Sequence, residues 1–162
     1  VALAAAMPGS VGVVVGSPAL RDHAERCFGF GQVMAAEYPG LTLLPALEGQ
    51  DDSARTQGLV DRLLAAHADL LAIYSVGAGN RGIAAALQAA GRARQVVFIA
   101  HELTPAARDL LLDGTLDAVI NQDIGHELRS ALRLADARRT QAPLQADQQR
   151  IRIDIYLRDN LP

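Results

Sequence analysis

The chain has 162 residues, of which half are hydrophobic and a fifth are charged, and its formal net charge is -3 at pH 7. This length suits one domain with a substantial core, and the hydrophobic content excludes an intrinsically disordered chain. The mild negative charge excludes the broad positive field on which non-specific nucleic-acid binding depends. No apolar run approaches the roughly 20 residues of a membrane-spanning helix, so we expect no membrane contact. The single cysteine, Cys27, excludes a disulfide within the chain.

Five apolar runs alternate with five stretches of helical pattern. The runs predict strands at residues 11–16, 41–47, 70–76, 96–100 and 116–121. The other stretches predict helices at residues 19–37, 54–68, 80–91, 104–114 and from 124 to about 139. Ser17 is the expected N-cap of the first helix, with Pro18 at its first position. This alternation is typical of an α/β fold, here a doubly wound parallel sheet with helices on both faces.

Both ends of the chain depart from this alternation. Residues 1–7 are apolar but too short for a signal peptide and without a basic flank, so we interpret residues 1–8 as the end of a helix. Residues 141–149 are polar and predict a loop. Ile151, Ile153 and Ile155 then alternate with polar residues, which predicts a strand with one solvated face at a sheet edge. We therefore expect the chain to be a fragment of a longer protein.

The stretch from residue 70 to residue 102 places polar residues where two predicted strands end. His101 and Glu102 follow the fourth strand, and a glycine-rich turn follows the third. In open α/β sheets the ligands bind at the carboxyl ends of the strands. This stretch therefore predicts either a dinucleotide site or a small-molecule pocket without chemistry.

The glycine-rich turn matches the dinucleotide-binding pattern G-x-G-x-x-G through Gly77, Gly79 and Gly82. Backbone amides and a helix N-terminus would hold a pyrophosphate there, and Glu102, 20 residues past Gly82, would bind a ribose. However, the pattern normally occupies the first strand–helix unit of its domain, and two such units precede it here. A plain tight turn also explains the glycines. An NAD-binding enzyme domain is therefore an alternative to the interpretation that we prefer.

Four segments of the chain resemble successive segments of one protein family. They are residues 16–30, 73–82, 96–102 and 112–122. The most specific motif is the run Leu112-Asp113-Gly114, which precedes a short strand that ends at Gln122. In order and spacing the segments resemble type I periplasmic sugar-binding proteins and the effector-binding domains of lactose-repressor-type transcription regulators. In that family two α/β lobes close over a ligand, and the resemblance implies that this chain is the C-terminal one.

The resemblance implies a division of the chain and a set of ligand contacts. Residues 1–140 would form the ligand-binding lobe, and residues 141–162 a loop and a terminal edge or returning strand. Arg26 matches an arginine that holds sugar hydroxyls with its planar fork of donors, and Gln122 matches a polar residue that reaches the same sugar. The turn after the third strand usually offers an asparagine and an aspartate. Here Ser75 or Asn80 would have to serve.

One predicted contact departs from the family. The fourth strand usually ends in an aspartate, whereas this sequence has His101, which can both donate and accept a hydrogen bond. This replacement suggests either an acidic or phosphorylated sugar as ligand, or a shift of the acceptor role to Glu102. His101 is thus the residue expected to set the identity of the ligand.

The preferred interpretation is the sugar-binding effector domain of a cytoplasmic, homodimeric transcription regulator. Such a protein would contact DNA only through a headpiece that is absent from this chain. A periplasmic sugar-binding protein of an ABC transporter is a second alternative, besides the NAD-binding enzyme. We expect no catalytic residues, no cofactor and no metal, since His23 and Cys27 lie one helical turn apart without further ligands.

Overall fold

The computed structural model describes residues 8–77, 79–143 and 152–162. The elements of these residues are β1 (Gly9–Val15), α1 (Arg21–Glu37), β2 (Leu41–Leu43), β3 (Leu47–Glu48), α2 (Ser53–Ala66), β4 (Leu70–Ser75), α3 (Asn80–Ala89), β5 (Val97–His101), α4 (Pro105–Asp113), β6 (Ala118–Gln122), α5 (Ile124–Thr140), β7 (Ile153–Tyr156) and a 3₁₀ turn (Arg158–Asn160). None of the helices in these ranges combines the length and the hydropathy that a membrane crossing requires.

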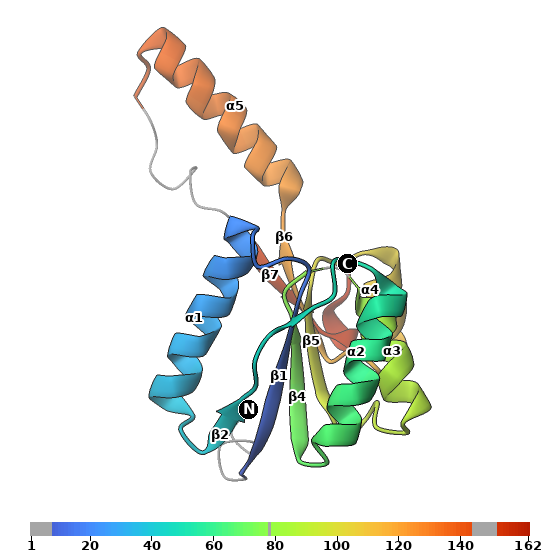
Figure 1. The fold of residues 1–162 in the computed structure, drawn as a ribbon. Helices are drawn as coiled ribbons and strands as arrows, with labels where there is room; N and C mark the ends of the chain where they lie inside the picture. The colour runs from blue at the N-terminus through green and yellow to red at the C-terminus, as the bar shows by residue number, and fades with distance from the viewer. Residues whose placement is uncertain (1–7, 78, 144–151) are drawn as a thin grey trace.

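The strands form one sheet in the order β2-β1-β4-β5-β6-β7, with β3 also paired to β1 (Figure 1). All pairs are parallel except β6 with β7, in which Val119 lies opposite Tyr156. The predicted α/β fold with a doubly wound, mostly parallel sheet is confirmed. The final strand lies at the sheet edge as predicted, although Ile151, the first residue of the predicted alternation, falls outside the described residues.

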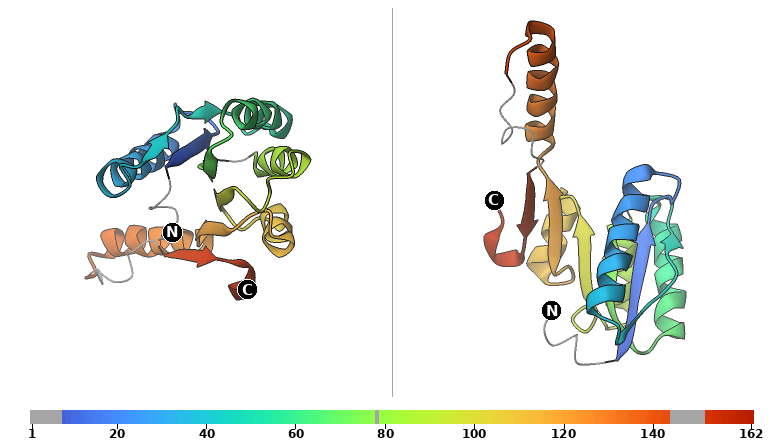
Figure 2. Two further views of the ribbon diagram at one scale, coloured as in Figure 1. Left: turned by 90° about the horizontal axis from the view of Figure 1, so that it is seen from below. Right: turned by 90° about the vertical axis from the view of Figure 1, so that its left-hand side faces the viewer.

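The helices lie on both faces of the sheet (Figure 2). Helices α2, α3 and α4 cover one face, where the main core contains Phe98, Leu70, Ile73, Leu87 and Leu111. Helix α1 lies on the other face, over a smaller cluster that contains Val13, Val15, Tyr74 and Val76. Side chains alternate between the faces of a strand, so the valines of β1 contribute to both clusters. Strand β1 is consequently buried along its whole length.

Several predicted boundaries differ from the structure by one or two residues, and two differences have a clear physical reason. The single strand predicted at residues 41–47 is divided into β2 and β3, because Pro45 between them has no N–H to donate to a ladder. Helix α1 begins at Arg21 rather than at residue 19, and Leu20 replaces Ser17 at the N-cap position. The Ser17 oxygens instead accept hydrogen bonds from the backbone N–H groups of Ala19 and Leu20, which forms a turn before the helix.

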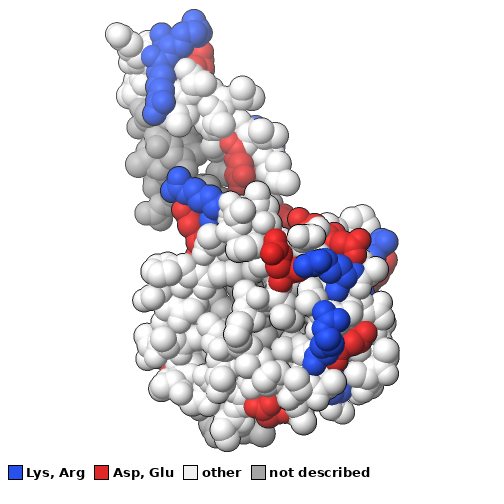
Figure 3. Space-filling model, in the orientation of Figure 1, with Lys and Arg blue, Asp and Glu red and all other residues white. Residues whose placement is uncertain are grey.

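Helix α5 extends away from the sheet (Figure 1). The Asp123 carboxylate caps it by accepting from the His126 N–H, yet none of its residues is buried. Ile124, Leu128 and Leu132 follow one another at helical spacing and are 62%, 61% and 71% exposed. Figure 3 shows basic side chains at the far end of this helix. Among the described residues, α5 thus has an apolar stripe, formed by these three residues, that no other element covers.

Candidate functional site

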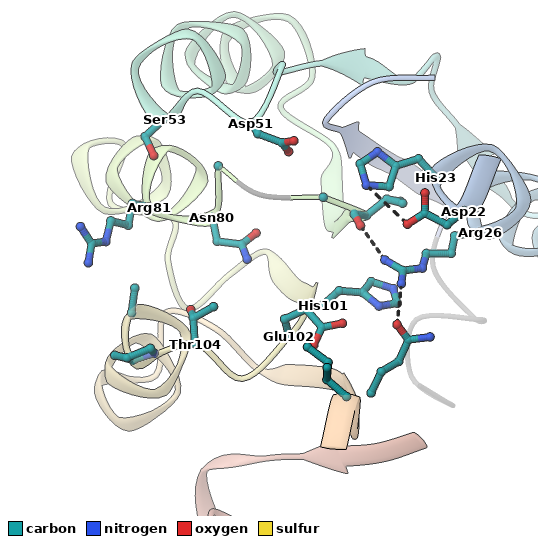
Figure 4. A pocket seen from close by; sticks show the side chains of 17 residues that line it. Asp22, His23, Arg26, Asp51, Ser53, Asn80, Arg81, His101, Glu102 and Thr104 are labelled. Atoms are coloured by element: carbon teal, nitrogen blue, oxygen red, sulfur yellow. Dashed lines mark hydrogen bonds and ion pairs between the residues drawn. The ribbon is translucent and has the colours of Figure 1, made fainter. Parts of the chain in front are cut away.

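A cavity of about 730 Å³ lies at the carboxyl ends of β4, β5 and β6 (Figure 4). Helices α1 to α5 all begin at its rim, since residues of their first turns contribute to its wall. The polar side chains that line it are Asp22, His23, Arg26, Asp51, Ser53, Asn80, Arg81, His101, Glu102, Thr104 and Gln122. The cavity therefore occupies the edge of the sheet at which open α/β folds bind ligands.

Arg26 joins α1 to two strand ends across the cavity. Its Nη1 donates to the backbone oxygen of Val76, 3.1 Å away, just after β4. Its Nη2 donates to Oε1 of Gln122, also 3.1 Å away, at the end of β6. A guanidinium has five N–H donors in one plane, so the remaining donors are available to a ligand. The structure thus brings together two of the predicted contacts, 96 positions apart in the sequence.

His101 and Glu102 lie side by side in the wall of the cavity (Figure 4). Burial, followed by the charges of Arg26 and His23, lowers the pKa of His101 to about 4, so its imidazole is neutral near pH 7. Burial raises the pKa of Glu102. Glu102 has a left-handed backbone, with φ of 66°, and its N–H donates to the backbone oxygen of Ile120. Such backbone strain is concentrated at functional sites in proteins.

Ser75 and Asn80 have different positions relative to the cavity. Asn80 lines it, whereas Ser75 is fully buried and does not belong to the lining. The Ser75 hydroxyl donates to Oδ1 of Asn80 over 2.7 Å. This bond fixes the orientation of the Asn80 amide, whose nitrogen remains a donor. Five of the predicted contacts thus lie at the cavity, and Ser75 supports one of them from behind.

Each glycine of the predicted dinucleotide pattern has a structural reason in this fold. Gly79 has φ of 100°, a conformation that other residues rarely adopt. A side chain at Gly82 would collide with the backbone of Ser53, where α3 packs against α2. A side chain at Gly77 would lie 2.8 Å from the backbone nitrogen of Gly16. Helix packing and close backbone contact therefore account for the pattern without a cofactor, while Ala78 lies outside the described residues.

Several lining residues were absent from the sequence-based prediction, notably Asp22, Asp51 and Thr104. All three follow a strand and lie in a loop or a first helical turn, so the rule that identified His101 could have found them. Asp22 and Asp51, together with Glu102, offset the arginines of the cavity, so the cavity is mixed in charge. Among the described residues no group of three His, Cys, Asp or Glu side chains is arranged to hold a metal ion.

Comparisons with known proteins agree with this architecture. A family model described as "Periplasmic binding protein domain" matches residues 2–140. An ABC transporter solute-binding protein from Agrobacterium vitis, bound with α-D-tagatopyranose, has a TM-score of 0.85 and 22% identity, covering 98% of this chain and 53% of that chain. No curated protein matches the sequence.

Two further solved structures have similar folds. An ABC transporter periplasmic solute-binding protein from Actinobacillus succinogenes 130z with bound D-allose has a TM-score of 0.82 and 18% identity, covering 98% of this chain and 55% of that chain. An ABC transporter solute-binding protein from Bacillus halodurans C-125 with bound myo-inositol has a TM-score of 0.78 and 19% identity, covering 94% and 53%. These TM-scores establish a common fold. The present chain spans about half the length of each of these proteins.

Proposed function

Since the chain belongs to the family of periplasmic binding protein domains, we propose that it forms one lobe of a protein that binds a small, neutral, polyhydroxylated ligand. The observation that carries this proposal is the convergence of Arg26, His101, Glu102 and Gln122 on one cavity at the strand ends. A monosaccharide or cyclitol presents several hydroxyl groups, each of which both donates and accepts. The cavity offers guanidinium and amide donors beside carboxylate acceptors, which suits such a ligand.

The charge of the cavity favours a neutral ligand over an acidic or phosphorylated one. Arg26 and Arg81 lie near three carboxylates, those of Asp22, Asp51 and Glu102. An anion bound among these carboxylates would be repelled as much as attracted. The solved relatives named above contain tagatopyranose, D-allose and myo-inositol, all of them neutral polyols. Binding of this class requires no reacting group, and the relatives' description as binding proteins supports the prediction that the chain is not an enzyme.

A second lobe would complete the site. The chain covers only 53% to 55% of the solved relatives, and α5 extends from the sheet with an apolar stripe exposed to solvent. We infer that this stripe packs against the other lobe and that the ligand is held between the lobes. Closure of two lobes around a ligand is a common hinge motion in binding proteins.

Transport is the physiological role that the comparisons favour, because the solved relatives named above are described as ABC transporter binding proteins. A lactose-repressor-type regulator would have the same lobe, and with it the predicted headpiece, homodimer and cytoplasmic location. None of the relatives named here is described as a regulator. The gene upstream of residue 1 decides between these roles, since a secretory signal indicates transport and a helix-turn-helix indicates regulation.

Calorimetric titration of the full-length protein with neutral monosaccharides, cyclitols, sugar acids and NADH tests the binding function. We expect saturable binding of a neutral polyol, weakened by about tenfold or more in Arg26→Met, because hydrogen bonds to charged groups are worth about 1.5–3 kcal/mol. Arg62→Met, an exposed arginine of α2 outside the cavity, is the matched control. Saturable binding of NADH without any response to polyols would overturn this proposal in favour of a dinucleotide site.

A further inference from the structure

A buried aromatic pair lies behind the wall of the cavity. Tyr74 belongs to β4 and His101 ends β5, the neighbouring strand, and both lie on the face of the sheet that α1 covers. The Tyr74 oxygen is 2.7 Å from Nε2 of His101, and the two residues are only 9% and 8% exposed. The ring of Phe30 packs against that of Tyr74, with 4.7 Å between the ring centroids. Tyr74 is therefore held in place by packing and does not itself line the cavity.

The hydrogen bond between these two residues determines which ring nitrogen carries the proton. Burial raises the pKa of Tyr74 and lowers the pKa of His101 to about 4, so both groups are neutral near pH 7. Among the described residues, Nε2 of His101 is the one hydrogen-bond partner of the Tyr74 hydroxyl. A buried hydroxyl donor requires an acceptor. The hydroxyl therefore donates to Nε2, and the proton of the neutral imidazole resides on Nδ1.

The Nδ1–H group is then a donor in need of an acceptor. Nδ1 is buried and has no hydrogen-bond partner among the described residues. In an imidazole ring the two nitrogens diverge, so this donor points away from Tyr74. His101 lines the cavity beside Glu102 and close to Arg26 (Figure 4). Because Nδ1 is closed off from solvent in this structure, an oxygen atom of a ligand would satisfy it after a small shift of the neighbouring side chains on binding.

We propose that Tyr74 is a positioning residue that locks His101 in the Nδ1–H tautomer, so that His101 recognises an acceptor oxygen of the ligand. The proposal rests on the proposed polyol-binding function and deepens it. A hydroxyl or ring oxygen can accept from Nδ1–H, whereas a protonated amino group cannot. The pair thus selects a neutral sugar or cyclitol over the corresponding amino sugar, although Tyr74 never touches the ligand.

The first test reads the tautomer directly. In the full-length protein with ¹⁵N-labelled histidine, long-range proton–nitrogen spectra distinguish a protonated Nδ1 from a protonated Nε2, and His101→Asn identifies the signals. We expect the proton on Nδ1 in the wild type. In Tyr74→Phe, which keeps the ring and removes the hydroxyl, we expect the Nε2–H tautomer to appear. A wild-type protein with the proton on Nε2 would overturn the inference whether or not any ligand binds.

The second test uses the affinities for D-tagatose, D-allose and myo-inositol. Asparagine places its amide near the position of Nδ1, whereas glutamine places it near that of Nε2. We expect His101→Asn to keep most of the affinity, and His101→Gln and Tyr74→Phe to lose on the order of tenfold. Tyr38→Phe, at the end of α1 and outside the cavity, controls for the loss of a phenol.

The order of these affinities separates the inference from the proposed function. If the pair were merely structural, His101→Gln would keep more affinity than His101→Asn, because only glutamine retains a group near Nε2 to pair with Tyr74. Wild-type binding with a greater loss in His101→Asn than in His101→Gln would therefore overturn the role of the pair and leave polyol binding intact. Absence of wild-type binding to every polyol would overturn the proposed function, and with it the selection of a ligand oxygen.

Discussion

Helices α3 and α5 both have an apolar side, but these sides have opposite environments. Helix α3 buries five of its ten residues, Gly82, Ile83, Ala84, Ala86 and Leu87. Helix α5 has 17 residues, and none of them is buried. An amphipathic pattern therefore indicates that a helix has an apolar side, but it does not indicate where the partner of that side lies. For α3 the partners are α2 and the sheet, whereas for α5 we infer that the partner is a second lobe.

The two helices also contribute differently to the site. Helix α3 begins at Asn80 in the wall of the cavity, so its packing against α2 fixes one side of the ligand site. Helix α5 begins at Ile124, also at the cavity, but leads away from the sheet. Helix α3 thus supports the ligand site of this chain. Helix α5 leads from that site toward the other lobe that we infer.

Truncation of one leucine on each helix should give the largest contrast. Leu87 on α3 is 0% exposed, and Leu132 on α5 is 71% exposed. In the 162-residue chain we expect Leu87→Ala to lower the free energy of unfolding by about 2–5 kcal/mol, and Leu132→Ala to change it by less than about 0.5 kcal/mol. Urea denaturation measures both.

The same pair of variants in the full-length protein sharpens the comparison. There a second lobe would bury Leu132, so we expect Leu132→Ala to cost about 2 kcal/mol or more. An equally small effect in the chain and in the full-length protein would mean that nothing packs on the apolar stripe of α5.

Acid should lower the free energy of unfolding of the chain through the protonation of His101. This histidine titrates near 6.5 when unfolded and near 4 in the folded protein, because burial and then the charges of Arg26 and His23 lower its pKa. Between these values the unfolded chain binds a proton that the folded chain does not. The free energy of unfolding therefore rises with pH from about 4 to 6.5, by at most about 3 kcal/mol.

Urea midpoints measured from pH 4 to pH 7 test this contribution. The difference between the wild type and His101→Asn isolates the histidine from the carboxylates that titrate in the same range. We expect the wild type to lose more stability than the variant as the pH falls through this window. Parallel pH profiles for the two proteins would show that the buried ring does not titrate as described.

A pair of glycines tests the close packing of α3 at a smaller magnitude. Gly82→Ala should cost about 2 kcal/mol, because its Cβ would collide with the backbone of Ser53 on α2. Gly58→Ala, in the middle of α2, should instead gain about 0.5–1 kcal/mol, since its Cβ would meet only the end of the Arg62 side chain. Thermal denaturation of both variants gives the comparison, and an equal response at the two glycines would contradict the close α2–α3 contact.

Much of the fold is predictable from the spacing of apolar residues, and much of the site from the polar residues that follow the predicted strands. Buried strands are apolar throughout, so their runs were recognisable, and ligands lie where such strands end, which identified His101 and Glu102. The sequence-based prediction of a single strand overlooks Pro45, which is apolar and fits the run in composition but has no N–H for the ladder. The prediction of Ser75 as a ligand contact neglects the alternation of side chains along a strand. This alternation places Ser75 on the opposite face of the sheet from Tyr74 and Val76.

The role of Tyr74 could not have been predicted from the sequence. A tyrosine inside an apolar strand reads as a core residue, and its hydroxyl partner, His101, is 27 positions away. Only the register of β4 and β5 brings the two together. Likewise the bond from Arg26 to Gln122 spans the chain from α1 to β6, and no local pattern encodes it.

A crystal structure of the full-length protein with its tightest-binding monosaccharide or cyclitol would test the central claim most directly. We predict a ligand at the strand ends of this lobe, with hydrogen bonds from Arg26 and from Nδ1 of His101, and with α5 packed against a second lobe. A ligand bound elsewhere, with the cavity between Arg26 and His101 unoccupied, would contradict the account.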